Sequence, residues 1–264
     1  MNIQNNYTNY NSKIWDKWSV DGDPWTIPIS HEDYEQAKLG KYHMVLTCQK
    51  DIPKEWYLPI AGKKLLGLAS GGGQQMPIMV ALGADVTVMD YSDKQLEAER
   101  FVSKRENYTI NIVKGDMSKS FPFEDNSFDI IFNPVSVNYI ENVEHVWKEC
   151  YRVLKPNGAL LSGFGNPFQF ALNNDDKITY KLPRNPLTDC TNKELEELLK
   201  DDGLLFSHSL NTLIGGQGRN GLHVVDLYED YHFGCELAPT YIATRAIKYK
   251  TINFMVIIIN SLLN

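Results

Sequence analysis

Between residues 63 and 163, short apolar segments alternate with longer amphipathic ones, and this alternation constrains the fold more than any other feature. The short segments have the length and β-branched content of strands, whereas the longer ones repeat apolar residues at helical spacing. We predict strands over 64–69, 85–89, 110–114, 128–132 and 159–163. Strands that alternate with helices form a parallel sheet covered by helices on both faces. The pattern therefore predicts an α/β fold with a doubly wound, mostly parallel sheet.

Capping residues and apolar spacing predict the helices between these strands. One helix covers 74–82, and another runs to Asn107 from an N-cap at Ser92, with Gln95 as the capping-box partner. A third helix is predicted from apolar residues at helical spacing: Val143, Val146, Trp147, Cys150 and Leu154. It ends at the turn KPNG, residues 155–158.

Beyond residue 164 the alternation loosens. Residues 165–190 are predicted to form one long connection, and connections of this length are uncommon in compact domains unless they cover a site. Two strand-like segments, 222–228 and 240–248, then close the domain.

The chain divides into an N-terminal extension over 1–60, a main domain over 61–250 and an apolar C-terminal tail over 251–264. The extension is rich in tryptophan, and one helix is predicted in it between an N-cap at Ser30 and a stop at Gly40. We expect the extension to be a lid. The tail contains FMVIII, an aggregation hazard if exposed, so we expect it to be covered or to contact a partner.

Composition and charge exclude several classes of protein. The 264 residues are 43% hydrophobic and 22% charged, as in globular proteins with a substantial core. A net charge of −7 argues against a nucleic-acid partner, and no apolar run approaches the roughly 20 residues that span a membrane. The N-terminus has no apolar signal segment, and the four cysteines form no paired metal-ligand motif. We therefore expect a cytoplasmic protein with no membrane partner and no metal site.

Three consecutive glycines follow the first predicted strand, in the sequence ASGGGQQ at 69–75. Glycine permits positive φ and a close approach of backbone to ligand, and the following helix presents free N–H groups. Ligands of open parallel sheets bind at such strand ends. The dinucleotide fingerprint G-x-G-x-x-G, however, would need a glycine where Met76 stands. The turn therefore predicts a nucleotide-like ligand and disfavours NAD and FAD.

Acidic residues stand at the ends of the next two predicted strands. Asp90 is free to accept the hydroxyls of a ribose, because Ser92 serves as the helix cap. Asp116 can accept from the exocyclic amine of adenine, and Met117 can lie against the ring. A role in a turn alone would explain Asp116 equally well. Two acids beside one glycine turn nevertheless favour a nucleoside ligand.

The region from about 60 to 163 resembles the class I S-adenosylmethionine-dependent methyltransferases, of the small-molecule kind called methyltransferase type 11. The resemblance rests on the glycine turn, Asp90, the triplet GDM at 115–117 and above all FPFEDNSFDIIF and YRVLKPNGALL. A wider run, from WTIPIS at 25–30 to TYIATRA, is similar to one uncharacterised bacterial branch of that family. It extends the resemblance to about residue 248.

The resemblance implies a Rossmann-like fold of seven strands whose last two form an antiparallel hairpin. It also implies S-adenosyl-L-methionine as cofactor and S-adenosyl-L-homocysteine as product. The methionine part would lie along the turn at 69–74, Asp90 would hold the ribose, and Tyr91 would flank the adenine, with Asp116 at its edge. The cofactor-binding residues implied are Ala69, Ser70, Gly71, Gly72, Gly73, Gln74, Gln75, Asp90, Tyr91, Gly115, Asp116, Met117, Asn133 and Pro134.

The first strand departs from the family pattern LDLGCGTG. Gly67 stands where the family has an acid that helps to hold the methionine ammonium, and Ala69 replaces the first glycine. We expect backbone carbonyls, or the amide oxygen of Gln74 or Gln75, to hold the ammonium instead.

The acceptor is predicted to be a small molecule that enters over the strand ends, in a protein that is a monomer or a homodimer. Four aromatic residues of the lid and the long connection are expected to roof it: Trp25, Tyr34, Phe168 and Phe170. The sequence ranks no general base among eight candidates: His31, His43, His145, His208, His223, His232, Tyr139 and Glu229.

Three functions stay open at this point. The first is an active methyltransferase on a small molecule, and the second is an NAD-dependent Rossmann oxidoreductase. The third is an S-adenosylmethionine-binding protein without catalysis, which the missing acid at Gly67 keeps open.

Overall fold

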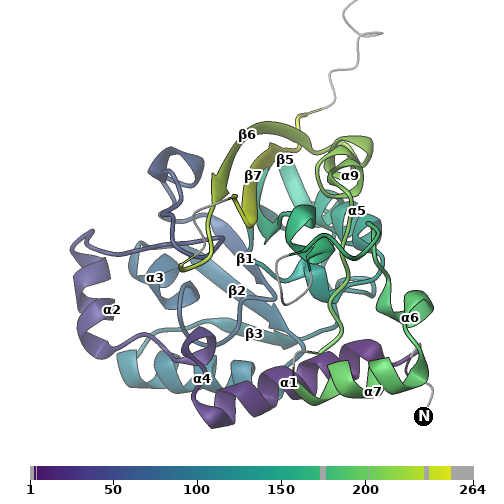
Figure 1. Ribbon diagram of the computed structural model, residues 1–264. Helices are drawn as coiled ribbons and strands as arrows, with labels where there is room; N and C mark the ends of the chain where they lie inside the picture. Colours follow the sequence, from purple (N-terminus) through teal and green to yellow (C-terminus); the bar gives the residue numbers. More distant parts are fainter. Residues whose placement is uncertain (1–2, 4, 173–176, 202, 235–237, 251–264) are drawn as a thin grey trace, which may run out of the picture.

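The computed structural model describes residues 3, 5–172, 177–201, 203–234 and 238–250. Helices cover both faces of one seven-stranded sheet (Figure 1). The strands are β1 (Lys64–Leu68), β2 (Asp85–Asp90), β3 (Asn111–Lys114), β4 (Phe128–Asn133), β5 (Leu154–Gly165), β6 (His223–Asp230) and β7 (Tyr241–Ile247). The α-helices are α1 (Tyr7–Asp21), α2 (His31–Lys38), α3 (Met76–Ala81), α4 (Asp93–Glu106), α5 (Val143–Val153), α6 (Pro186–Asp189), α7 (Asn192–Asp201), α8 (Leu210–Leu213) and α9 (Gly215–Arg219). The 3₁₀ helices are η1 (Pro24–Thr26), η2 (Lys54–Trp56), η3 (Val137–Tyr139) and η4 (Pro167–Ala171).

The sheet has the strand order β3-β2-β1-β4-β5-β7-β6. Strands β1 to β5 are parallel to one another, and β7 is antiparallel to both β5 and β6. The predicted doubly wound fold and the antiparallel last pair are therefore confirmed. Strand order reverses between β1 and β4, and such a reversal opens a crevice at the carboxyl ends of the strands.

The two faces of the sheet bury separate hydrophobic clusters. Leu65 of β1 packs in the cluster that includes residues of α2, α3 and α4, while its neighbour Leu66 packs in the cluster of α5 and α8. Both faces are buried, which explains why the central strands read as continuous apolar runs rather than alternating ones.

The segment KPNG, predicted as a turn, instead forms part of β5. Helix α5 ends at Val153 and β5 begins at the next residue, so no turn separates helix from strand. The strand pairing shifts register here, because Phe128 and Ile130 of β4 are opposite Leu154 and Ala159. The extra residues bulge out of the ladder, with Asn157 in the left-handed region at φ 66°.

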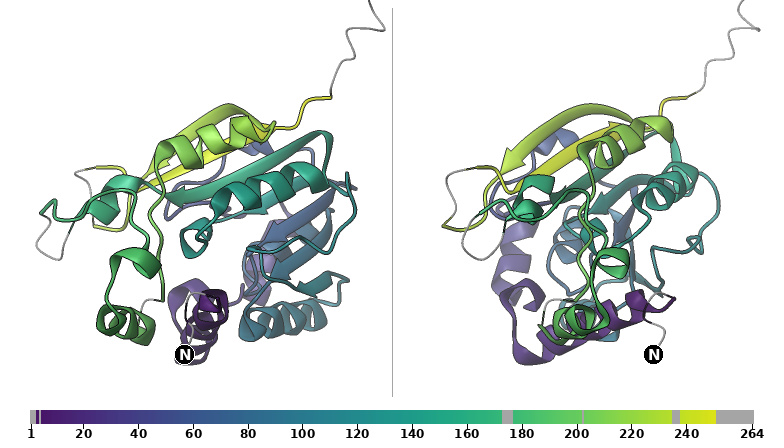
Figure 2. Two further views of the ribbon diagram at one scale, coloured as in Figure 1. Left: turned by 90° about the vertical axis from the view of Figure 1, so that its right-hand side faces the viewer. Right: turned by 45° about the vertical axis from the view of Figure 1, so that its right-hand side comes forward.

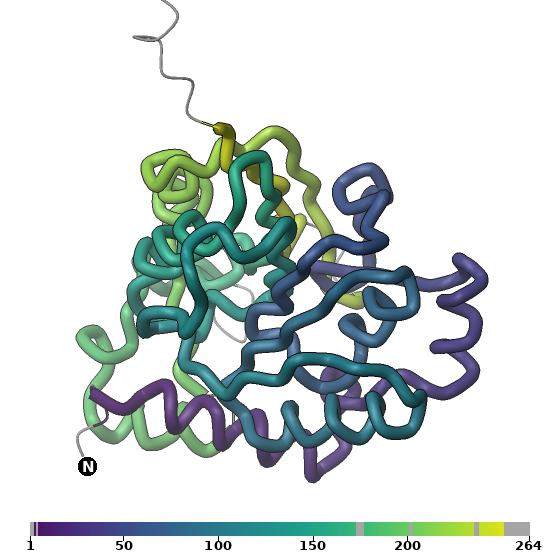
Figure 3. The backbone as a smooth tube through the Cα atoms, turned by 180° about the vertical axis from the view of Figure 1, so that it is seen from behind, coloured from purple at the N-terminus to yellow at the C-terminus, as the bar shows by residue number. Residues whose placement is uncertain are grey.

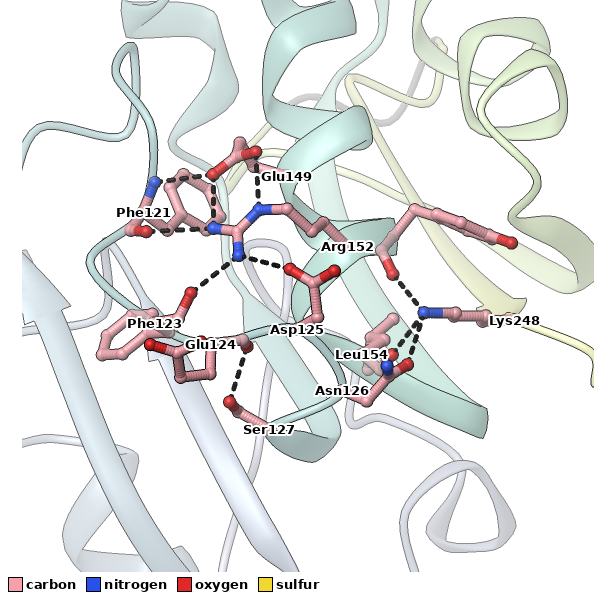
Figure 4. A network of polar contacts seen from close by, with 11 residues as sticks. Phe121, Phe123, Glu124, Asp125, Asn126, Ser127, Glu149, Arg152, Leu154 and Lys248 are labelled. Carbon is pink, nitrogen blue, oxygen red and sulfur yellow. Dashed lines mark hydrogen bonds and ion pairs between the residues drawn. The ribbon is translucent and has the colours of Figure 1, made fainter.

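A network of polar contacts joins α5, the loop before β4 and the end of β7 at the amino ends of β4 and β5 (Figure 4). Arg152 donates to the carboxylates of Glu149 and Asp125 and to two backbone carbonyls of the 121–123 segment. Lys248 donates to the backbone of α5 and β5 and to Asn126. The motifs FPFEDNSFDIIF and YRVLKPNGALL therefore interlock with one another.

Helix α1, which the sequence analysis did not predict, lies beside α7 and reaches α4 (Figures 2 and 3). Its buried stripe contains Tyr7, Asn11 and Ile14. A polar residue inside the stripe interrupts the apolar pattern, and Asn11 is satisfied there by the backbone N–H and carbonyl of Leu204. The helical spacing of Tyr7, Ile14 and Trp18 was the sequence feature that could have predicted this helix.

The long connection after β5 holds more structure than predicted. It contains η4 and α6, and α7 follows at once. Residues 173–176 of this connection lie outside the described residues, as does the whole predicted tail over 251–264. The extension shares the core of the main domain, since Trp56 and Leu46 belong to the same cluster as β1. The boundary at residue 60 stays a prediction.

Candidate functional site

A cavity of about 350 Å³ lies at the carboxyl ends of β1 to β4, and α1 forms one side of it. Eleven of the fourteen residues predicted to bind a cofactor line it: Ala69, Ser70, Gly71, Gln74, Gln75, Asp90, Tyr91, Gly115, Asp116, Met117 and Pro134. The sequence reasoning thus selected residues that are far apart in the chain but share one cavity.

The other three predicted residues do not line the cavity. The N–H of Gly72 donates to the carbonyl of Gln95, and the N–H of Gly73 donates to the carboxylate of Glu99, so these glycines turn toward α4. Asn133 is fully buried, and its amide donates to the backbone of β1. These contacts hold the glycine turn against α4 and the end of β4 against β1, outside the cavity lining.

Asp90 and the glycine turn are in direct contact. The N–H of Gly71 donates to Oδ2 of Asp90 at 3.0 Å, and a Cβ at position 71 would lie 3.0 Å from the same oxygen. The N–H of Ser92 donates to Oδ1 at 2.9 Å. Burial raises the pKa of Asp90, and these backbone donors oppose the rise. Asp90 is therefore less free than predicted, although each oxygen keeps a second lone pair.

The cap of α4 differs in part from the prediction. Ser92 accepts the N–H of Gln95, as an N-cap should, but the capping box does not close. Gln95 donates instead to the hydroxyl of Ser19 in α1, at 2.7 Å. Asp16 of α1 accepts from the Ser92 hydroxyl and from the N–H of Lys94, so α1 completes the cap from outside.

Asp116 also contacts α1. Its Oδ2 accepts the hydroxyl of Thr8 at 2.7 Å, and its Oδ1 accepts the N–H of Ser118 at 2.8 Å. Met117 is buried beside the cavity, and Tyr91 lines it from the end of β2. Of the two predicted nucleoside acids, Asp116 is thus bonded directly to α1, a helix that was not predicted, and Asp90 is linked to it through Ser92.

Met76 explains the glycine that replaces the family acid. A Cβ at Gly67 would lie inside the van der Waals contact distance of the Met76 Sδ and 2.9 Å from its Cγ. Met76 is fully buried, so it occupies the space that a carboxylate would need. The two glutamines proposed as substitutes hold the extension: Gln75 accepts the N–H of Val45, and Gln74 donates to the carbonyl of Ile27.

A second buried acid lies behind the turn. Glu99 of α4 is fully buried, and its Oε1 accepts the N–H of Gly73 at 2.7 Å. Its Oε2 makes no hydrogen bond among the described residues. Burial raises the pKa of Glu99 to about 8. The carboxyl group thus supports the glycine turn while it is largely protonated at neutral pH.

The aromatic roof differs from the predicted one. Trp25 lines the cavity as expected, but the other aromatic lining residues are Trp15, Trp18, Tyr91, Tyr139 and Tyr241. The described cavity wall includes none of the other three residues expected there: Tyr34, Phe168 and Phe170. Tyr34 stacks on Tyr108 between α2 and α4, and Phe168 is exposed.

A loop of the extension forms another part of the cavity wall. Leu46, Thr47 and Cys48 line the cavity, and burial raises the pKa of the Cys48 thiol. The sequence analysis missed this loop, because VLTC carries no motif and its position depends on contacts with distant strands. The buried Asp230 of β6 accepts the N–H groups of Cys48, Gln49 and Lys50 and so holds the loop in place.

The comparisons with known proteins agree with this geometry. The family described as "Methyltransferase domain" matches residues 66–162. An uncharacterized methyltransferase of Bacillus subtilis (strain 168), YbaJ, is 43% identical over 248 residues, which cover 90% of this chain and 97% of that protein. The chain belongs to the class I S-adenosylmethionine-dependent methyltransferases.

Solved structures of methyltransferases share the fold. A methyltransferase from Mesorhizobium loti matches with a TM-score of 0.59 and 18% identity, over 74% of this chain and 94% of that one. Geranyl diphosphate C-methyltransferase from Streptomyces coelicolor A3(2), in complex with S-adenosyl-L-homocysteine, matches with a TM-score of 0.52 and 15% identity, over 73% and 75%. As a member of the class I S-adenosylmethionine-dependent family, the protein uses S-adenosylmethionine as its cofactor. In the described part of the chain, no helix is long and apolar enough to cross a membrane.

Among the candidate bases of the methyltransferase, only Tyr139 lines the cavity; none of the six histidines does. His208 is largely buried with its Nε2 2.8 Å from the carbonyl of Ile140, and burial lowers its pKa. His232 stacks on Tyr241 outside the lining, and Glu229 is exposed on β6. Tyr139 is therefore the one candidate general base that lines the cavity, and its role is not assigned.

One group of metal-ligand side chains comes together within the described residues, away from the cavity. Ligand atoms of His31, Glu35 and Glu106 lie within 4.8 Å of one another. Glu106 is already paired there with His31 and Arg105. The group contributes nothing to the cavity.

Proposed function

We propose that this methyltransferase transfers a methyl group in line from its cofactor to a small-molecule acceptor, and that both bind in the cavity at the strand ends. The observation that carries the proposal is the convergence of eleven residues, selected from the sequence alone, on one cavity. The relative from Bacillus subtilis supports the reaction class over nearly the whole chain.

The residues present fit the cofactor. Gly71 has no side chain, so a ligand can approach the backbone of the turn closely. Each oxygen of Asp90 keeps a lone pair that can accept a ribose hydroxyl. Asp116, with Met117 and Tyr91 nearby, would hold the adenine. Gln74 and Ser70 line the end of the turn, where the methionine part would lie.

The cofactor supplies an electrophilic methyl group on a sulfonium. The chain aligns the acceptor with this methyl group and excludes water. Because the transfer needs no covalent intermediate with the protein, this positioning is the main contribution to the rate. The indoles of Trp15 and Trp18 in α1 cover the cavity and exclude water. Tyr139 lies at its wall, where it can orient an acceptor.

Calorimetric titration with S-adenosyl-L-homocysteine tests the cofactor site. We expect wild-type protein to bind it and not NAD, and Asp90→Ala to bind at least about 100-fold more weakly, because a buried charge-assisted contact is lost. Asp93→Ala is the matched control, since Asp93 is exposed and pairs with Lys114. A folded Asp90→Ala variant with wild-type affinity would remove the ribose assignment.

A screen of acceptors that follows release of S-adenosyl-L-homocysteine tests catalysis itself. Turnover of any small molecule separates an enzyme from a protein that only binds the cofactor. Tight binding of NAD in place of S-adenosyl-L-homocysteine would instead favour the oxidoreductase. The cytoplasmic location, and the monomer or homodimer, stay predictions.

A further inference from the structure

The loop Leu46–Cys48, hereafter the 46–48 wall, is fixed to the half of the sheet that the cofactor residues leave open. The carbonyl of Leu46 accepts the N–H of Val135 after β4, at 3.2 Å. Gly163 of β5 makes room for it, because a Cβ there would run into the Leu46 carbonyl. The predicted cofactor residues lie at the ends of β1 to β4, and the same cavity is also lined by the wall, by the segment after β4 and by Tyr241 of β7.

One buried carboxylate holds the segment that contains this wall. Oδ2 of Asp230, at the end of β6, accepts the Thr47 hydroxyl at 2.7 Å and the N–H groups of Cys48, Gln49 and Lys50 at 3.0, 2.7 and 3.0 Å. Its Oδ1 accepts the N–H of Tyr231. Asp230 is only 4% exposed, and although burial raises its pKa, these donors hold the pKa below its usual value. Asp230 is therefore an anion whose ligand is the loop itself.

The charges around the cavity restrict what can lie against the wall. Among the described lining residues the only charged groups are Asp90 and Asp116, and both lie on the nucleoside side. The indoles of Trp15 and Trp18 line the same cavity as the wall. A carboxylate or phosphate bound there would be desolvated without a cation among these residues, and unpaired buried charge is strongly unfavourable.

We propose that the acceptor of the reaction is an uncharged apolar molecule that binds between the 46–48 wall and the tryptophans of α1, and that Asp230 is the positioning residue of this subsite. The proposal rests on the function proposed above. Asp230 acts through the loop and does not itself line the cavity.

Protein saturated with S-adenosyl-L-homocysteine provides the test of the acceptor class, because the cofactor half is then filled. The probes are 2-naphthol and 2-naphthoate, which share a ring system and differ in charge, and calorimetry measures their binding. We expect the naphthol to bind at least about tenfold more tightly than the naphthoate. Equal or tighter binding of the naphthoate would overturn the acceptor class.

Asp230→Asn tests the positioning role, because one of the two oxygens becomes an amide donor facing N–H groups. We expect binding of 2-naphthol to weaken at least about tenfold while the affinity for S-adenosyl-L-homocysteine changes less than about twofold. Asp226→Asn is the matched control: Asp226 lies on the same strand and accepts the Trp56 indole N–H, away from the wall. It should lower stability without changing the preference between the two probes.

These outcomes distinguish failure of the proposed function from failure of the positioning role of Asp230. Failure of wild-type protein to bind S-adenosyl-L-homocysteine would contradict the proposed function, whatever the probes do. Wild-type naphthol affinity in folded Asp230→Asn would overturn the positioning role alone. If Asp230→Asn does not fold, Thr47→Val removes one of the four donors to Oδ2, and unchanged naphthol binding in that variant would overturn the role equally.

Discussion

The two ends of the central sheet are built in different ways. At the amino ends, Arg152 and Lys248 satisfy backbone carbonyls and carboxylates within the main domain (Figure 4). At the carboxyl ends, part of the cavity wall comes from the extension, whose helix α1 contacts the predicted nucleoside residue Asp116 through Thr8 and the α4 cap residue Ser92 through Asp16. The motifs FPFEDNSFDIIF and YRVLKPNGALL therefore build the scaffold, whereas segments of the extension without a motif form part of the cavity wall.

The difference has a physical origin. An interlocked set of donors and acceptors at the amino ends demands particular residues, because a buried polar group left unpaired costs free energy. A cavity wall demands only shape and low polarity, which many sequences supply. The two ends should therefore respond differently to substitution.

Arg152→Ala should have the largest effect on stability. It leaves the carboxylate of Glu149 without its cation and two backbone carbonyls without a donor, so we expect the free energy of unfolding to fall by about 3 kcal/mol. Urea denaturation followed by circular dichroism measures this. The affinity of the folded protein for S-adenosyl-L-homocysteine should stay within about twofold.

Lys200→Ala serves as the control for Arg152→Ala. Lys200 and Glu197 form an exposed ion pair, and such pairs contribute about 0–1 kcal/mol. If Arg152→Ala lowers the free energy of unfolding by no more than this, or greatly weakens cofactor binding, then the amino ends do not serve stability separately from the site.

Glu99→Gln should change how stability depends on pH. The unfolded carboxyl loses its proton near its ordinary pKa of 4.5, whereas the folded one keeps it until about 8, so the folded state binds more protons between these values. Wild-type stability therefore falls as pH rises through this window. From pH 6 to pH 9 we expect a loss of roughly 2–3 kcal/mol relative to Glu99→Gln.

Denaturation of both proteins at the two pH values measures that difference. Burial raises the pKa of Asp90 in the same direction, but the comparison removes its contribution because both proteins contain it. Parallel pH profiles for wild type and variant would show that Glu99 is not protonated behind the turn.

Gly67→Ala tests why the family acid is missing. The added methyl group would overlap the buried Met76, so we expect a destabilisation of about 1–2 kcal/mol. In the Met76→Ala background the same change should cost less or stabilise, and thermal denaturation of the four proteins of this double-mutant cycle measures the coupling. Simple additivity would mean that Met76 does not exclude a side chain at position 67.

Thr8→Val should have the smallest effect. It removes the donor from α1 to Asp116 and keeps the shape, so we expect the free energy of unfolding to fall by about 0.5–1.5 kcal/mol. Faster amide hydrogen exchange confined to α1 would show that the contact holds the helix over the cavity. An unchanged exchange pattern would assign that role to the other contacts.

The sequence predicted the main domain well and the walls of the site poorly, for reasons visible in single residues. Strand β1 could be predicted because Leu65 and Leu66 are buried on opposite faces, which leaves a continuous apolar run. Helix α1 could not, since Asn11 interrupts its stripe and is satisfied by the distant Leu204 and Tyr139. Local pattern cannot report a partner that lies far along the chain.

The same limit applies to the site. Asp90 was predicted because it follows a strand, and it lines the cavity. Thr47 and Cys48 follow no regular element, and their place depends on Asp230, some 180 residues away. The turn KPNG was misread because a bulge and a turn use the same residues, with Asn157 in the left-handed region in either case.

Two parts of the cavity wall, α1 and the loop Leu46–Cys48, belong to one continuous stretch of about the first fifty residues. Within its described residues, 3 and 5–50, this stretch contributes no strand to the sheet. Its sequence can therefore diverge while the chemistry beneath it stays the same. We therefore expect substitutions on the cavity side of this stretch to change which acceptor is bound while the network at the amino ends of the strands, and with it the scaffold, stays intact.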